Sequence, residues 1–400
     1  MNIRAKRKWW LLRIDDIMLL LMFSGMNRIF WNDAATTTRI RMYVSIVITL
    51  YLLVKKEITR CNKQSLMIPY ISSILLAGIV NYGFTEDLLG TIVTCIFIFD
   101  LFALTLRYVR IYGIEDLLDT VVTQKLHFII IFMLVNDFSV LYAGKLTKAI
   151  SSTQAAVMYF SGNKFSVAFI HMIVTFLFCC HHYSTWNRNS LEKIKFLIIG
   201  FYNIFFCMFM SCGTGAIGCV LIIILSMCSG KVKKTFSYPA TFILLLIILN
   251  YLFIGTNVLL SNGVFQNIVL LLGKDLTLTG RMGIYPKLAE IIENSLFFGY
   301  GDATQIVAKV VGYGNAQNGI LHIFVQYGVL GVSSFIFMCS KAISKVKKSG
   351  EENLAIAYPI LVYTNIMIVC SLVEICFSYN FLFGIALLNA CGEYSAKEYL

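Results

Sequence analysis

The chain has 400 residues, of which 58% are hydrophobic and only 14% are charged, and its formal net charge is +12. A soluble domain needs a more polar surface, so this balance excludes a soluble globular protein and predicts that most of the chain lies in lipid. The positive charge calls for no nucleic-acid partner, because membrane proteins collect basic residues in their cytoplasmic loops.

Apolar segments with the length of membrane-spanning helices recur along the chain. Crossing about 30 Å of hydrocarbon takes roughly 20 helical residues. We therefore predict an all-α, polytopic integral membrane protein with about twelve transmembrane helices. Their approximate ranges are 10–30, 42–54, 66–82, 88–106, 126–142, 165–180, 196–212, 214–228, 238–256, 318–339, 355–374 and 376–391. The first segment contains charges and no small-residue cleavage site, so we expect a retained anchor rather than a cleaved signal peptide.

The distribution of basic residues predicts the orientation. Placing the N-terminus in the cytoplasm puts most of the 33 Lys and Arg residues on the cytoplasmic side. The first group is Arg4, Lys6, Arg7 and Lys8, and further groups follow every second predicted helix. Translocated loops resist such groups. We expect a multi-pass protein of the cytoplasmic membrane with both termini in the cytoplasm.

One polar segment, residues 257–317, interrupts the apolar sequence late in the chain. It divides the chain into transmembrane helices 1–9 (1–256), a large extracytoplasmic loop (257–317), and helices 10–12 with a short cytoplasmic tail (318–400). Within the loop, Pro286 predicts the first turn of a short helix that ends near Glu293. Leu288, Ile291 and Ile292 share one side of that helix, so it is expected to be amphipathic and to lie at the membrane interface.

Residues that would hold a cofactor are not apparent in the sequence. The twelve cysteines show no CxxC spacing, and the large outer segment contains none, so they are interpreted as small core residues rather than as metal or redox ligands. No glycine-rich phosphate loop is present, which argues against ATP-driven transport and against a nucleotide-sugar donor. We predict neither a cofactor nor a metal.

Acidic residues within the predicted spans provide a second set of candidates. Ionised groups are costly in lipid unless they are paired or hydrated. Asp15, Asp16 and Asp137 belong to this set; Asp100 is expected to pair with Arg107 or another buried cation. Glu374 falls near the predicted outer face, and it is the candidate of this set for a functional site.

Two stretches of the late loop resemble the signature of the O-antigen polymerase and ligase superfamily. They are TGRMGIYPKLAEIIENSLFFGYGD and NAQNGILHIFVQYGVLG. The matching positions are Arg281, residues 294–301, Asn318 and residues 328–331. Gln317 occupies the position of the family's histidine, on which ligase-type members rely, so the resemblance favours a polymerase. The chain also has Asn294-Ser295 in place of Asn-Pro, and residues 211–214 in place of an earlier Ser-Arg pair.

The resemblance implies glycosyl transfer between two polyprenyl-pyrophosphate-linked oligosaccharides at the outer leaflet, with membrane lipids, a chain-length regulator and a repeat-unit flippase as partners. The departing pyrophosphate needs a cation, and a guanidinium can bind two of its oxygens. We assign this role to Arg281, with Lys287 as a helper. Glu290 is the predicted general base, with Asp302 as the alternative.

Four further residues are predicted to bind substrate. Gln317 and Asn318 precede a helix whose free N–H groups favour anions, Tyr285 can stack on a sugar face, and Glu374 faces the same side of the membrane. Simpler roles remain open, since the Gln317-Asn318 pair can serve only as a helix cap and interfacial tyrosines commonly act as anchors. A ligase, or a flippase or other transporter, remains an alternative function, although a transporter commonly has an internal repeat that this chain lacks.

Overall fold

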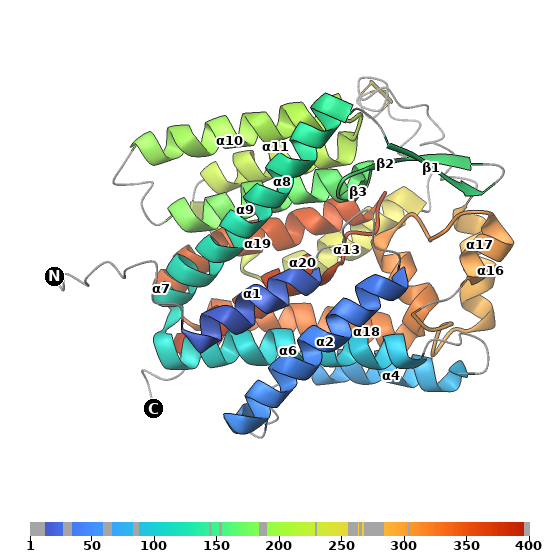
Figure 1. The fold of residues 1–400 in the computed structure, drawn as a ribbon, viewed down its shortest axis with the longest axis horizontal. Helices are drawn as coiled ribbons and strands as arrows, with labels where there is room; N and C mark the ends of the chain where they lie inside the picture. Colours follow the sequence, from blue (N-terminus) through green and yellow to red (C-terminus); the bar gives the residue numbers. More distant parts are fainter. Residues whose placement is uncertain are drawn as a thin grey trace.

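The structure of the protein, a computed structural model, describes residues 13–26, 34–58, 66–82, 88–143, 146–151, 154–183, 190–228, 230–254, 263, 266–267, 284–302 and 305–395. Helices make up most of these residues and lie lengthwise in one bundle (Figure 1). A helix satisfies every backbone hydrogen bond within itself, which is the requirement that lipid imposes. The helical, membrane-type architecture expected from the sequence is confirmed at this level.

Each of the twelve predicted segments contains a helix. These helices are α1 (Ile14–Met26), α2 (Ala34–Val54), α4 (Ile68–Val80), α6 (Leu88–Tyr112), α8 (Thr123–Ala143), α9 (Lys164–His182), α10 (Ser190–Phe209), α11 (Gly213–Met227), α13 (Pro239–Ile254), α18 (Gly319–Lys348), α19 (Glu351–Ser371) and α20 (Tyr379–Ser395). Shorter elements join them: α7 (Ile114–Asp116), the π-helical turn η1 (Leu117–Val122), α12 (Gly230–Phe236), α16 (Tyr285–Asn294) and α17 (Ile306–Val311).

Length and composition support fewer spans than the sequence predicts. Among the described residues, six helices are long and apolar enough to cross a membrane, and a seventh span results if α11 and α12, bent by 118° at their junction, are counted together. The helices α4 and α13 are apolar but shorter. A multi-pass membrane protein is thus supported, while twelve spans and the orientation remain predictions.

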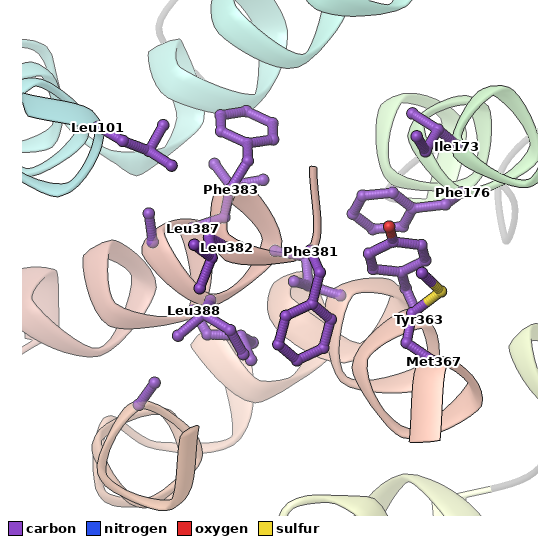
Figure 2. Close-up of a cluster of buried hydrophobic side chains, with 14 of the residues drawn as sticks. Leu101, Ile173, Phe176, Tyr363, Met367, Phe381, Leu382, Phe383, Leu387 and Leu388 are labelled. Atoms are coloured by element: carbon purple, nitrogen blue, oxygen red, sulfur yellow. The ribbon is translucent and has the colours of Figure 1, made fainter. Parts of the chain in front are cut away.

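The core of the bundle is built around α19 and α20. Both helices are buried along nearly their whole length, and α20 packs against α6 and α18 while α19 packs against α11. Aromatic rings fill the contacts between them. The rings of Phe176 and Tyr363 stack with centroids 4.1 Å apart, as Figure 2 shows. The outer helices α2, α10 and α13 instead expose large apolar side chains, which is the surface that lipid would cover.

Three short strands form a structure that the all-α prediction did not include. They are β1 (Leu146–Ser151), β2 (Gln154–Tyr159) and β3 (Gly162–Asn163), paired antiparallel in that order. This sheet lies at the same end of the bundle as α16 and α17, whereas α7 lies at the opposite end (Figure 1). We refer to the two ends as the strand end and the α7 end.

The α7 end contains a buried network of ion pairs. Arg107 Nε lies 2.9 Å from Asp15 Oδ1, and its Nη1 lies 3.1 Å from Glu57 Oε1. Arg110 contacts the other oxygen of Glu57 at 2.5 Å, and Arg13 pairs with Asp116 at 2.9 Å. These pairs join α1, α6 and α7 to the segment that follows α2. The charges that lipid would penalise are thus neutralised by one another.

The expected pairing of Asp100 with Arg107 is wrong. The carboxylate of Asp100 accepts hydrogen bonds of 3.1 Å from the hydroxyl of Thr49 on α2. Seven residues on one helix amount to about two turns, or roughly 10 Å, which separates the two groups along α6. Arg107 therefore lies within the network at the α7 end, and Asp100 lies nearer the middle of the bundle.

Candidate functional site

The amphipathic helix predicted in the late loop is present as α16. Tyr285, Leu288 and Ile291 are buried, and the side chains of Lys287 and Glu290 are exposed on its other faces. The apolar face packs against α17 and α18, and the expected position at the membrane interface stays a prediction. Protein contacts cover this face because the loop folds back onto the bundle and forms a small core of its own.

The glycine-rich turn after α16 is locked into a break in α18. At Gly328 the backbone leaves the helical conformation, with φ 63° and ψ −162°, which frees backbone groups on both sides. Tyr300 N donates to Val325 O at 2.9 Å, and Val329 N donates to Leu296 O at 2.8 Å. A side chain at Gly328 would meet backbone atoms at 2.3 Å. The turn and the glycine break that carry the family resemblance thus form one structural joint.

Two of the predicted binding residues, Tyr285 and Asn318, form hydrogen bonds within the protein. The hydroxyl of Tyr285 donates to Leu372 O at 3.2 Å. Asn318 caps α18: its Oδ1 accepts from Ile320 N and Leu321 N, both at 3.0 Å, and its Nδ2 donates to Asn250 Oδ1 at 2.9 Å. The cap ties the start of α18 to α13. Because these groups are already hydrogen-bonded, both residues position the loop in the structure.

Asp302, the alternative base, is enclosed by side chains of two helices. Its carboxylate accepts hydrogen bonds from the Tyr327 hydroxyl at 2.8 Å and from the Thr94 hydroxyl at 3.2 Å. Nearby, Tyr300 donates its hydroxyl to Ile291 O at 3.1 Å, and burial raises the pKa of this phenol. Tyr300 therefore stays a neutral donor, and Asp302 joins the loop to α6 and α18.

A polar cavity of about 300 Å³ lies between the end of the loop, the connection from α19 to α20 and the start of α9. Gln317 and Glu374, predicted separately from the loop and from a span, both line it. The other polar side chains of its described lining are amides and hydroxyls: Ser161, Asn163, Ser166, Asn315, Ser378 and Asn380. Glu374 is the one ionisable residue in the described lining, and its side chain is 6% exposed.

Gln317 is held in an unusual conformation at the cavity wall. Its φ is 52°, in the left-handed region that non-glycine residues seldom adopt. Asn315 Oδ1 supports this conformation by accepting from Gln317 N at 2.9 Å and from Gln317 Nε2 at 2.8 Å. Such backbone strain is stored at functional sites more often than elsewhere. The strain and its support therefore point to a fixed orientation of the Gln317 amide.

The opposite wall of the cavity is positioned by the strands and by a buried network. Asn163 caps α9, its Oδ1 accepting from Phe165 N and Ser166 N. Ser161 donates through N and Oγ to Asn136 Oδ1, at 3.1 and 2.8 Å. Asn136 in turn donates to Asp137. The cavity wall is thus tied to α8.

That network continues across the bundle from Asp137. The carboxylate accepts from the Tyr202 hydroxyl at 2.6 Å and lies 3.3 Å from His171 Nε2. His171 Nδ1 lies 2.8 Å from Asn203 Oδ1. Asp137, predicted only as an acid within a span, therefore supports the wall through neighbours on α8, α9 and α10.

The remaining predicted site residues lie outside the described residues or outside the described lining of the cavity. Arg281 and the turn before it lie outside the described residues, so the first catalytic assignment stays a prediction. Glu290 and Lys287 are exposed on α16 and are not in the described lining of the cavity. Ser161 and Asn163 were missed, because they lie outside the loop motif and their polarity is ordinary for a turn. Among the described residues, no group of three His, Cys, Asp or Glu side chains is arranged to hold a metal ion.

Comparison with known proteins adds no relative. No family model matches the chain, and no curated protein or solved structure matches it either.

Proposed function

We propose that the protein is a membrane glycosyltransferase that polymerises polyprenyl-pyrophosphate-linked oligosaccharide repeat units into a surface polysaccharide. The observation that carries this proposal is the cavity, where Gln317 from the motif-bearing loop and Glu374 from the end of α19 line one polar space. Neutral amides and hydroxyls around a single carboxylate suit the recognition of sugar hydroxyl groups. The loop sequence supports the assignment through its resemblance to O-antigen polymerases.

The proposed reaction is a displacement at the anomeric carbon of the donor. The acceptor hydroxyl oxygen forms a bond to that carbon, the bond from the carbon to the pyrophosphate oxygen breaks, and polyprenyl pyrophosphate leaves. Glu374 accepts the hydroxyl proton in this proposal, because it is the carboxylate of the described cavity lining. Arg281 neutralises the charge that develops on the departing pyrophosphate.

The proposed reaction also implies an orientation in the membrane and partner proteins. The strand end faces the outside of the cytoplasmic membrane in the proposal, where repeat units delivered by a flippase would be joined and a chain-length regulator would act. Gln317 and Asn163 orient the acceptor and donor sugars through their amides. A transferase that positions two reactants in this way gains rate by holding the reacting atoms close together.

The test compares two glutamates of the same part of the molecule. We expect Glu374→Gln, which keeps the size of the side chain, to reduce long surface polysaccharide at least about 100-fold, because a lost general base has an effect of that order. Glu290→Gln, on the exposed face of α16, is the matched variant. The readout is the length distribution of surface polysaccharide, normalised to protein in the membrane.

The outcomes separate the functions. Accumulating single repeat units with loss of polymer support a polymerase, and polymer assembled normally but left unattached to its acceptor supports a ligase. If Glu290→Gln removes polymer and Glu374→Gln does not, the base is Glu290. An unchanged ladder in both variants contradicts the assignment of either carboxylate as a base.

A second test concerns Arg281. Arg281→Lys retains the positive charge but loses the fork that binds two oxygens, so we expect polymer to fall at least about tenfold with unchanged membrane insertion. Near-normal polymer from this variant would remove Arg281 from the site.

A further inference from the structure

Lys125 on α8 is a buried cation with an unusual environment. Its side chain is 0% exposed. Its Nζ lies 3.1 Å from the Sδ of Met26, 4.5 Å from the ring centroid of Phe23 and 5.1 Å from that of Phe383. A thioether is a weak acceptor, and the ring faces offer only cation–π attraction. Among the described residues, no carboxylate lies within ion-pair distance of this amine.

Arg107, another buried cation among the described residues, has counter-ions. Arg107 has a side chain 10% exposed, and it contacts two carboxylates, those of Asp15 and Glu57. An ammonium buried without a counter-ion is costly, and such a group persists in membrane proteins mainly where it serves a function. Lys125 therefore calls for an explanation that its contacts with the described residues do not give.

One residue, Met26, connects Lys125 to the polar cavity. Met26, which its Nζ contacts, is one of the residues lining the cavity. The two rings around the amine lie one helical turn deeper than lining residues, because Phe23 precedes Met26 by three positions on α1 and Phe383 follows Asn380 by three on α20. Met26 thus contacts the amine through its Sδ and is also part of the cavity lining.

The charges in the cavity lining show why the position of Lys125 matters. Its described lining has many hydrogen-bond donors but no cation. A ligand that carries phosphate binds more firmly when a positive group contacts its oxygens. Methionine is unbranched and adaptable, and lysine has a flexible stem, so a small movement of Met26 brings the two together.

We propose that Lys125 is an anion-binding group of the cavity, in addition to Arg281, and contacts the phosphate oxygens of a phosphate-bearing ligand when the Met26 side chain turns aside. The pyrophosphate identity of that ligand rests on the proposed function, whereas the cation site rests on the contacts above. A volume of about 300 Å³ suits a headgroup or a small anion. Both a lipid-linked and a free pyrophosphate present this chemistry.

The experiment measures binding to the purified full chain in detergent by calorimetry. The probes are farnesyl pyrophosphate and inorganic pyrophosphate. Lys125→Met removes the charge and suits the thioether and aromatic surroundings, so it should fold with equal or higher thermal stability. Lys231→Met, an exposed cation on α12, is the matched control. Met26→Ala removes the thioether that contacts the amine.

We expect Lys125→Met to weaken binding at least tenfold, Lys231→Met to leave it within twofold of the wild type, and Met26→Ala to tighten it. Dependence on Lys125 for farnesyl pyrophosphate alone identifies a lipid headgroup, and dependence for both probes identifies the free anion as well. A Lys125→Met protein that binds both probes as the wild type does overturns the inference, as does a wild type that binds neither.

Polymer length in cells, measured in parallel, separates this inference from the proposed function. Loss of pyrophosphate binding with normal polymer keeps the anion site and contradicts its part in polymerisation. Normal binding in Lys125→Met, together with loss of polymer in Glu374→Gln, overturns the anion site and leaves the proposed function standing.

Discussion

At the α7 end of the bundle Arg107 contacts Asp15 and Glu57, whereas at the strand end the cavity holds neutral amides and hydroxyls around Glu374. Both ends contain polar groups that lipid would penalise. At the α7 end those groups satisfy one another, so that they hold α1 and α6 together with the segment after α2. At the strand end they face a space of about 300 Å³. Buried charge alone therefore does not identify a functional site. Polar side chains that line one shared cavity are stronger evidence for such a site.

Breaking the ion-pair network gives the largest expected effect on stability. Arg107→Leu leaves the carboxylate of Asp15, whose side chain is 4% exposed, without its guanidinium and leaves Glu57, 2% exposed, with Arg110 alone. Removing one partner of a buried pair costs about 3 to 5 kcal/mol. We expect a marked fall in the thermal unfolding temperature in detergent and less protein in the membrane.

The matched control for this change is Arg39→Leu, since Arg39 is an exposed arginine on α2. Unfolding temperatures that agree for the two variants would show that the network does not hold the α7 end together.

The joint between the loop and α18 gives the next largest effect. Gly328→Ala places a side chain on backbone that glycine alone adopts readily and brings it within 2.3 Å of Phe297. The backbone conformation alone costs about 1 to 3 kcal/mol, and the clash adds to it. We expect faster proteolysis after residue 284 and loss of polymer.

Gly314→Ala serves as the control, because an added Cβ meets nothing within 4 Å there. Equal proteolysis of the two variants would mean that the turn docks on α18 without needing the glycine break.

The smallest expected effect on stability sharpens the contrast between the two ends. Asn163→Asp keeps a side-chain oxygen that caps α9, and asparagine and aspartate are comparable caps. It also adds a second negative charge to a cavity already lined by Glu374. We expect an unfolding temperature within about a degree of the wild type but at least about tenfold less polymer, because the added negative charge repels an anionic ligand.

Asn163→Ser retains the cap, removes the same amide and adds no charge, so the loss of polymer in Asn163→Asp beyond that in Asn163→Ser measures the effect of the charge. If Asn163→Asp makes polymer as the wild type does, the cavity does not receive an anionic substrate.

The sequence located several elements because local chemistry determined them. Pro286 and the spacing of Leu288 and Ile291 predicted α16, and Asn318 predicted the start of α18. The pairing of Asp100 was wrong, because the partner of a buried acid depends on which helix packs beside it. The three strands were missed because segments of two to six residues carry little periodic signal.

The candidate site was predicted in part. Gln317 and Glu374 were both proposed from the sequence, but nothing in the sequence places them at one cavity, because they lie at the ends of different helices. Ser161 and Asn163 join them only through the packing of α9 against its neighbours. No local sequence pattern singles out Lys125, and only the positions of Met26, Phe23 and Phe383 reveal its burial.

By itself the sequence determined the apolar, helical character of this protein and the position of its polar segment. Apolar runs and helix-starting residues are properties of neighbouring positions in the chain. Tertiary structure decided which buried charges are paired, where the loop docks, and which polar groups share a cavity. Those properties depend on distances between helices that are far apart in the chain, and the order of residues does not encode such distances in any local pattern.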